Sequence, residues 1–173
     1  VRTSMGRLQE DIGRLRGLGF ELLIIDTPPA ITSTIATVIG MADLVVTPTR
    51  PSPHDLRSVA RTVELAERMD KPLIFVVNAA SSRAKITLNV AVALSQHGTL
   101  APSIIHQRSD FASSMIDGRT VMEISRKSPS AVEIGELWDY LEWRLERISQ
   151  RGIGTPVNTS HSYNERFSVR NAS

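Results

Sequence analysis

The chain has 173 residues, 41% of them hydrophobic, and 20 Lys and Arg residues stand against 18 Asp and Glu residues, a net charge of +2. This composition is that of one globular domain and excludes a collagen-like or wholly disordered chain. The absence of cysteine excludes disulfides, thiolate metal sites and a cysteine nucleophile. The nearly balanced charge permits nucleic-acid binding without arguing for it.

The N-terminal region carries no secretory signal pattern, and no apolar run approaches the roughly 18 residues of a membrane span. We therefore expect a cytoplasmic protein without a membrane segment. The chain begins with Val1 rather than Met, which leaves open whether this is the natural start.

Short apolar runs alternate with helical patterns along the chain. A helical pattern over residues 5–15 comes first. The apolar runs that follow have the length of strands that are buried on both faces. They are Leu22–Ile25, Leu44–Thr47, Leu73–Val77 and Ser103–His106. Three helices are predicted between these runs. The first covers Thr32–Met41, the second begins at Pro53 with Ser52 as its N-cap, and the third covers Ala84–His97. This alternation predicts an α/β fold with a mostly parallel sheet flanked by helices.

Two further helices are predicted after the last run, a short one from Asp110 to Asp117 that ends at Gly118 and a long one from about Ser130 to Gln150. The predicted apolar face of the long helix consists of Ile134, Leu137, Trp138, Leu141, Leu145 and Ile148, with Tyr140 and Trp143 at a partly exposed edge. The remaining residues are polar and aperiodic. We therefore divide the chain into a folded domain over residues 1–150 and a disordered tail over residues 151–173.

Polar residues follow two of the predicted strands, at the edge of the sheet where open α/β folds bind ligands. Asp26 follows the first strand, and a carboxylate there is suited to hold Mg²⁺ or its water shell. Asn78 follows the third strand, and its amide offers a donor and an acceptor to the edge of a purine ring. Each has a structural alternative, since Asp26 can cap the next helix and Asn78 can close its strand as an Asx turn.

Five segments, in this order and spacing, resemble the ParA family, the branch of deviant-Walker P-loop ATPases that segregates plasmids and chromosomes and is related to MinD. The segments are FELLIIDTPPA, ADLVVTPTRPSPHDLRSV, PLIFVVNAASSR, IIHQRSDFASSMIDGRTVMEI and SPSAVEIGELWDYL. The resemblance covers about Phe20 to Leu145. It implies a P-loop NTPase-like fold, an ATP-bound homodimer, binding to DNA without sequence preference, a centromere-binding ParB-like partner and association with the nucleoid.

The resemblance also implies roles for individual residues. Asp26 is similar to the Walker B aspartate, the catalytic residue that positions Mg²⁺ through water, and Thr27 starts the loop that senses the γ-phosphate of ATP. Asn78 is similar to the asparagine that contacts adenine, and Arg108 falls where the family lines the base pocket.

Scattered basic residues are the candidates for DNA binding, and those that we single out are Arg83, Lys85 and Arg119. Phosphate neutralisation by such residues gives affinity that depends on salt and is independent of sequence. The alternative is that these residues are part of an ordinary solvated surface. With a net charge of only +2, the two interpretations are about equally favoured.

The family's Walker A loop, of the type KGGVGKT, occurs nowhere in the 173 residues. That loop binds phosphates through backbone N–H groups and lysines. We therefore expect that the chain alone does not hydrolyse ATP. Three explanations stay open: the C-terminal part of a longer ParA protein, a degenerate paralogue, and an expressed piece of such a protein.

Two other classes of function are considered. The first is a non-enzymatic DNA- or partner-binding remnant of a ParA protein, which only the missing loop distinguishes from the ATPase. The second is a receiver-type signalling domain with Asp26 as phosphoacceptor and Thr47 as switch residue. A receiver requires a lysine where this chain has Asn78, and it leaves the long C-terminal helix unexplained.

Overall fold

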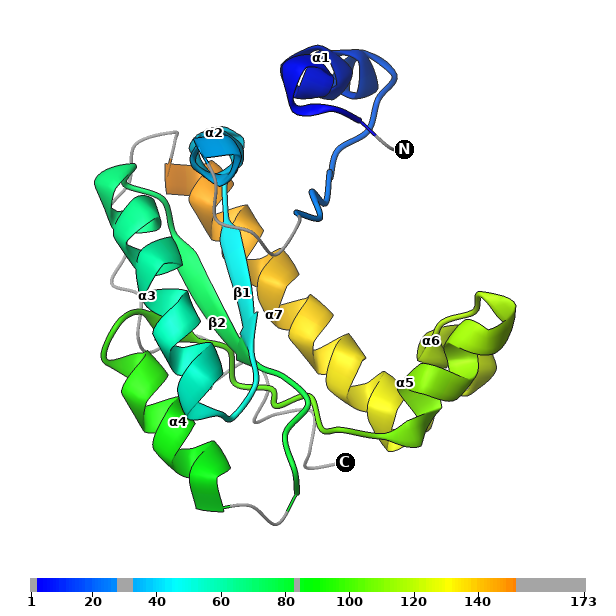
Figure 1. The fold of residues 1–173 in the computed structure, drawn as a ribbon. Helices are drawn as coiled ribbons and strands as arrows, with labels where there is room; N and C mark the ends of the chain where they lie inside the picture. Colours follow the sequence, from blue (N-terminus) through cyan, green and yellow to red (C-terminus); the bar gives the residue numbers. More distant parts are fainter. Residues whose placement is uncertain (1–2, 28–32, 83–84, 152–173) are drawn as a thin grey trace.

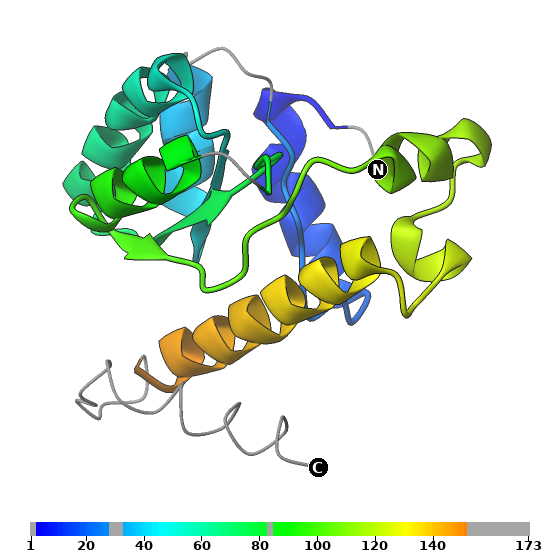
Figure 2. The same cartoon turned by 90° about the horizontal axis from the view of Figure 1, so that it is seen from below.

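The computed structural model describes residues 3–27, 33–82 and 85–151. Its sheet has three parallel strands in the order β1-β2-β3, with α3 and α4 on one face and α7 on the other (Figures 1 and 2). The elements are η1 (Met5–Arg7), α1 (Leu8–Gly17), α2 (Ser33–Met41), β1 (Val45–Thr49), α3 (Pro53–Arg68), β2 (Leu73–Val77), α4 (Lys85–Ser95), β3 (Thr99–Leu100), α5 (Ser109–Ser114), η2 (Met115–Asp117), α6 (Val121–Ile124) and α7 (Pro129–Arg151). The predicted α/β fold is confirmed.

The middle strand β2 is hydrogen-bonded on both of its edges. On one edge it pairs with β1 from Val45↔Leu73 to Thr49↔Val77. On the other it pairs with β3, and the chain beyond β3 stays alongside, since Ala101 N–H donates to the Phe75 carbonyl at 2.8 Å and Ile105 N–H to the Val77 carbonyl at 2.9 Å. Strand β2 is therefore the centre of the sheet.

Alternate side chains of β2 pack into two separate clusters, as expected for a strand that is covered on both faces. Phe75 and Val77 lie against α3 and α4, where the buried partners are Val59, Val63, Val90 and Leu94. Ile74 and Val76 lie on the opposite face, where the buried partners are Ala101, Ile105, Tyr140 and Trp143. These two clusters attach the helices to the sheet.

Local capping chemistry determines where the two longest helices begin. Ser52 Oγ accepts a hydrogen bond from Asp55 N–H at 3.1 Å, and Pro53 is the first residue of α3, which confirms the predicted start. In the same way, Ser128 Oγ accepts from Ala131 N–H at 3.2 Å ahead of Pro129, the first residue of α7.

The predicted strand over Leu22–Ile25 is wrong. Residues 20–27 belong to neither a helix nor a strand, and the described sheet contains no strand from this part of the chain. The apolar residues have the composition of a strand, but a strand forms only where its backbone pairs with a neighbour. The segment instead runs between α1 and α2 outside the sheet (Figure 1).

The strand predicted over Ser103–His106 is displaced. Regular pairing occurs just before it, in β3, while His106 forms an isolated parallel bridge with Ala80. Pro102 lies between the two pairings and has no N–H to donate, so the ladder is interrupted there.

The predicted apolar face of α7 is wrong at its aromatic residues. Tyr140 and Trp143 are 5% and 9% exposed and pack on the sheet, whereas Trp138 is 41% exposed. The rings of Tyr140 and Trp143 lie 5.9 Å apart, centroid to centroid, and the Arg147 guanidinium lies over Trp143. Relative to the prediction, the face of α7 that packs on the sheet is therefore rotated toward Tyr140 and Trp143.

Other predictions have simpler outcomes. The short helix after the last run is confirmed as α5 with η2, and it ends at Gly118 with a φ of 78°. Helix α6 was not predicted, although Thr120 and Glu123 form its capping box. The proposed tail lies outside the described residues apart from Arg151. Within the described ranges, no helix is long and apolar enough to cross a membrane.

One edge of the sheet carries no strand in the described structure. Strand β1 pairs only with β2, and its Val46 side chain is 40% exposed. Alternate residues of the unpaired segment are exposed too, with Phe20 at 55%, Leu22 at 43% and Ile24 at 82%. An open edge together with exposed apolar side chains favours association between copies.

We predict that the chain self-associates through this edge in a concentration-dependent way. The double substitution Ile24→Lys with Val46→Lys places one charge on the exposed unpaired segment and one on the edge strand, and it lowers the associated fraction at least severalfold, as measured by sedimentation velocity. Leu88→Lys, at a 69% exposed position on α4, is the matched control and leaves association unchanged. Equal effects of the two variants would show that exposed apolar surface in general, and not the edge, causes association.

Candidate functional site

The chain turns sharply where β2 ends, at Asn78 and Ala79. Asn78 N–H donates to the Thr49 carbonyl at 2.9 Å, which continues the pairing with β1 by one residue. The Asn78 side-chain oxygen accepts from Ala79 N–H at 2.9 Å, and Ala79 has a φ of 51°. A left-handed alanine is uncommon and costs about 1 kcal/mol, so its surroundings must stabilise it. The half-buried Asn78 amide is thereby fixed at the carboxyl end of the sheet.

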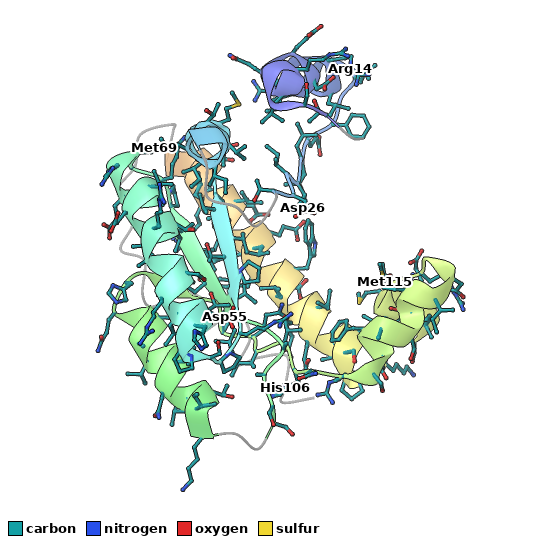
Figure 3. All side chains as sticks on the ribbon, in the orientation of Figure 1. Arg14, Asp26, Asp55, Met69, His106 and Met115 are labelled. Atoms are coloured by element: carbon teal, nitrogen blue, oxygen red, sulfur yellow. The ribbon has the colours of Figure 1, made fainter. Side chains whose placement is uncertain are left out.

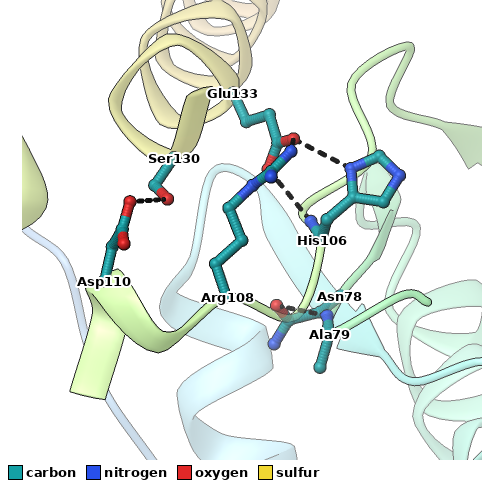
Figure 4. Close-up of polar contacts among 7 residues, drawn as sticks. All are labelled: Asn78, Ala79, His106, Arg108, Asp110, Ser130 and Glu133. Atoms are coloured by element: carbon teal, nitrogen blue, oxygen red, sulfur yellow. Dashed lines mark hydrogen bonds and ion pairs between the residues drawn. The ribbon is translucent and has the colours of Figure 1, made fainter. Parts of the chain in front are cut away.

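The residue after this turn holds the chain beyond β3. Ala80 is fully buried, its N–H donates to the Ile105 carbonyl at 3.0 Å, and its carbonyl accepts from Gln107 N–H at 2.9 Å. Together with the bridge between Ala80 and His106, these bonds bring the segment 105–108 beside Asn78 (Figure 4). The segment that carries the predicted site residue Arg108 is thus held next to the turn that carries Asn78.

Glu133, on the second turn of α7, receives three hydrogen bonds from this segment. His106 N–H donates to Oε2 at 3.0 Å, His106 Nδ1 lies 2.8 Å from Oε1, and Arg108 Nη2 donates to Oε1 at 2.6 Å (Figure 4). A carboxylate can only accept, so the contact with the ring assigns the proton to Nδ1 of His106.

The electrostatics of this cluster favour its charged form. Burial raises the pKa of the Glu133 carboxyl, but the hydrogen bonds from Arg108 and His106 outweigh it and the pKa lies below its ordinary value. The hydrogen bond to Glu133 raises the pKa of Arg108 further above its already high value. The Glu133 side chain is 14% exposed and the Arg108 side chain 33% exposed, so the ion pair is partly shielded from water.

A second contact joins the start of α7 to the same segment of chain. Ser130, which is fully buried, donates from its hydroxyl to Asp110 Oδ2 at 2.9 Å. Both Asp110 and Glu133 lie near the N-terminus of α7, where the helix dipole favours negative charge. The first two turns of α7 therefore fix residues 106–110 from one side.

The structure does not bring Asp26 and Thr27 to this place. Both are exposed and lie in the unpaired segment. In Figure 3, Asp26 lies far from Asp55 and His106, which mark the carboxyl end of the sheet. No group of three or more potential metal-binding side chains occurs within the described part of the chain. One exposed carboxylate does not make an assembled Mg²⁺ site among the described residues.

The candidate DNA-binding residues have different surroundings. Lys85 is exposed at the first position of α4. Arg119 is also exposed, but its Nη2 lies 2.6 Å from Asp117 Oδ2 and its Nε donates to the same carboxylate at 2.9 Å. Arg83 lies outside the described residues.

Sequence reasoning singled out Arg108 but missed its partners. Glu133 lies 25 residues after Arg108, and Ser130 lies 20 residues after Asp110, so no local sequence pattern connects these pairs. The available indication was a carboxylate near the N-terminus of the long helix, beside its apolar face.

A comparison with solved structures identifies the fold. No family model matches the chain. The structure is similar to that of the cell division ATPase MinD from Pyrococcus furiosus, with a TM-score of 0.66 and 16% identity, over 82% of this chain and 59% of the MinD chain. This match shows the fold, which is that of MinD.

A segment of 49 residues is 45% identical to the maintenance of carboxysome distribution protein A from Gloeobacter kilaueensis. The match covers 28% of this chain and 23% of that protein. The match thus spans only part of the length of both of these proteins. Together the two matches support the resemblance to the ParA and MinD family that the sequence motifs carry.

Proposed function

We propose that the chain is the base-binding part of a ParA- or MinD-type ATPase that segregates plasmids or chromosomes. In this proposal the complete protein binds ATP with Mg²⁺, forms a homodimer, binds DNA of any sequence and responds to a centromere-binding ParB-like partner. One observation carries the proposal: in a MinD-type fold, Asn78 stands at the carboxyl end of β2 with the segment 106–108 beside it.

The chemistry of Asn78 suits adenine. Its oxygen accepts one hydrogen bond from Ala79 and keeps a second lone pair, and its amide nitrogen carries two donors. Adenine offers the complementary pair, an amino group that donates and a neighbouring ring nitrogen that accepts. Because the turn fixes the amide, little side-chain entropy remains to be lost when a base binds.

The phosphate and metal side of the site is proposed to require more than these residues. Asp26 and Thr27 would serve Mg²⁺ and the γ-phosphate, and both lie in the unpaired segment. No GK[ST] motif occurs in the sequence to supply backbone donors and a lysine to the phosphates. We therefore propose that this chain recognises adenine nucleotides weakly and does not hydrolyse them.

The first prediction concerns nucleotide binding. ATP titrated into the chain perturbs the NMR signals of the Asn78 side-chain amide, and Asn78→Ala weakens binding by about tenfold, the magnitude of one or two lost hydrogen bonds. Asn89→Ala, at an exposed position of α4, is the matched control. Mg²⁺-dependent ATP hydrolysis above background that Asp26→Ala abolishes would overturn the statement that the chain is inactive.

The second prediction concerns DNA. If Arg83 and Lys85 bind phosphates, gel-shift affinity falls steeply between low and moderate salt, and the double substitution Arg83→Glu with Lys85→Glu lowers it further. Arg57→Glu with Arg61→Glu, two exposed positions on α3, is the control for net charge. We expect Arg119→Glu to have a smaller effect, because Asp117 already pairs with Arg119.

The two measurements also separate the proposal from the alternative of a non-enzymatic remnant. A remnant would bind DNA in the gel shift without any nucleotide-induced change at Asn78. Equal loss of DNA affinity in both double variants would show that only the overall charge matters, and the assignment of DNA binding to α4 would be wrong.

A further inference from the structure

Glu133 occupies a position that the proposed function does not use. It touches no predicted site residue except Arg108, yet it accepts hydrogen bonds from the backbone of His106, the ring of His106 and the guanidinium of Arg108. Three donors on one carboxylate, from two residues of one short segment, fix both the backbone and a side chain of that segment.

The hydrogen bond to Glu133 also determines which donors of Arg108 are available to a ligand. Its Nη2 is committed to Oε1 at 2.6 Å, and its Nε is buried without a hydrogen-bond partner in the described structure. The side chain leads from the chain beside Asn78 to Glu133 (Figure 4). The Arg108 side chain is 33% exposed, and a guanidinium whose plane is fixed by its bond to Glu133 can stack on the ring of a base.

We infer that Glu133 is the positioning residue of the base site: it fixes the guanidinium plane of Arg108, and it holds the backbone of His106 in the segment that lies next to the Asn78 turn. This inference rests on the proposed function, because it names what shapes the base-binding side of the same site. The ligand is a purine nucleotide, which Asn78 meets at its edge and Arg108 at its face. Glu133 itself does not touch the ligand.

The packing of α7 fixes the position of the Glu133 carboxylate. Farther along α7, Tyr140 and Trp143 are buried against Ile74 and Val76 of β2. Nearer its start, the buried Ser130 bonds Asp110. The carboxylate is therefore carried on a helix that is anchored on both sides of it, as a positioning group requires.

The pH dependence of stability gives an independent readout. The groups that face the carboxylate are His106 and Arg108, with Asp110 acting on Arg108. Since the pKa of Glu133 is lowered in the folded chain, its stabilising effect is present above the unfolded pKa of about 4.3 and is lost as pH falls through the lower folded pKa. We predict that Glu133→Gln lowers the melting temperature at pH 7 and that its difference from the unmodified chain shrinks below pH 4.

The decisive experiment uses NMR on the full chain, with AMP as the probe and ribose 5-phosphate as the ligand without a base. We expect AMP, and not ribose 5-phosphate, to shift the Asn78 side-chain amide and the Arg108 Nε signal. Glu133→Gln weakens AMP binding at least fivefold and speeds hydrogen exchange at His106 N–H. Glu136→Gln, at an exposed position of the same helix, changes neither.

A double-mutant cycle separates positioning from general stability. If Glu133 acts through Arg108, Glu133→Gln adds little to the loss of AMP affinity that Arg108→Lys already causes, because lysine has no planar face. Fully additive losses, or unchanged AMP affinity in Glu133→Gln, would overturn the inference while leaving the proposed function intact. Absence of any AMP-specific change at Asn78 in the unmodified chain would overturn the proposed function, and with it the assignment of Glu133 to a nucleotide site.

Discussion

Hydrogen bonding along both edges of β2 is the constraint on which the rest of the structure depends. With β1 on one side and β3 on the other, four consecutive residues, Ile74–Val77, are at most 1% exposed. Burial of this kind on both faces requires helices on both faces, which α3, α4 and α7 provide. The same pairing continues past the strand at Asn78 and Ala80, so backbone hydrogen bonds extend to the end of the sheet.

Helix α7 joins the core to the candidate site. Its aromatic residues complete one face of the sheet, and its first turns bind the segment that carries His106 and Arg108. A carboxylate that is partly buried is costly unless it is paired, and Glu133 meets that cost with three donors. The geometry at Arg108 is therefore a consequence of how α7 packs along its whole length.

Local sequence signals predicted the parts of the fold that depend on local physics. The start of α3 at Pro53 follows from the Ser52 cap, and β2 follows from five consecutive apolar residues. The predictions were wrong where contacts between residues distant in sequence determine the structure. The Leu22–Ile25 run has the composition of a strand without a strand to pair with, and Tyr140 faces the sheet because β2 offers its ring a surface. Glu133 was missed for the same reason, since only the fold brings it to Arg108.

The two sides of the proposed nucleotide site make different demands on this chain. The base side needs an oriented amide and a supported guanidinium, and contacts among described residues supply both. The metal side needs Asp26 at the carboxyl end of a paired strand, while residues 20–27 are unpaired and the outer edge of β1 is open. In the proposed function, base recognition would therefore depend on packing that the described residues provide, and metal chemistry on strand pairing that they do not. Under that proposal, adenine recognition and hydrolysis are separable properties of this chain.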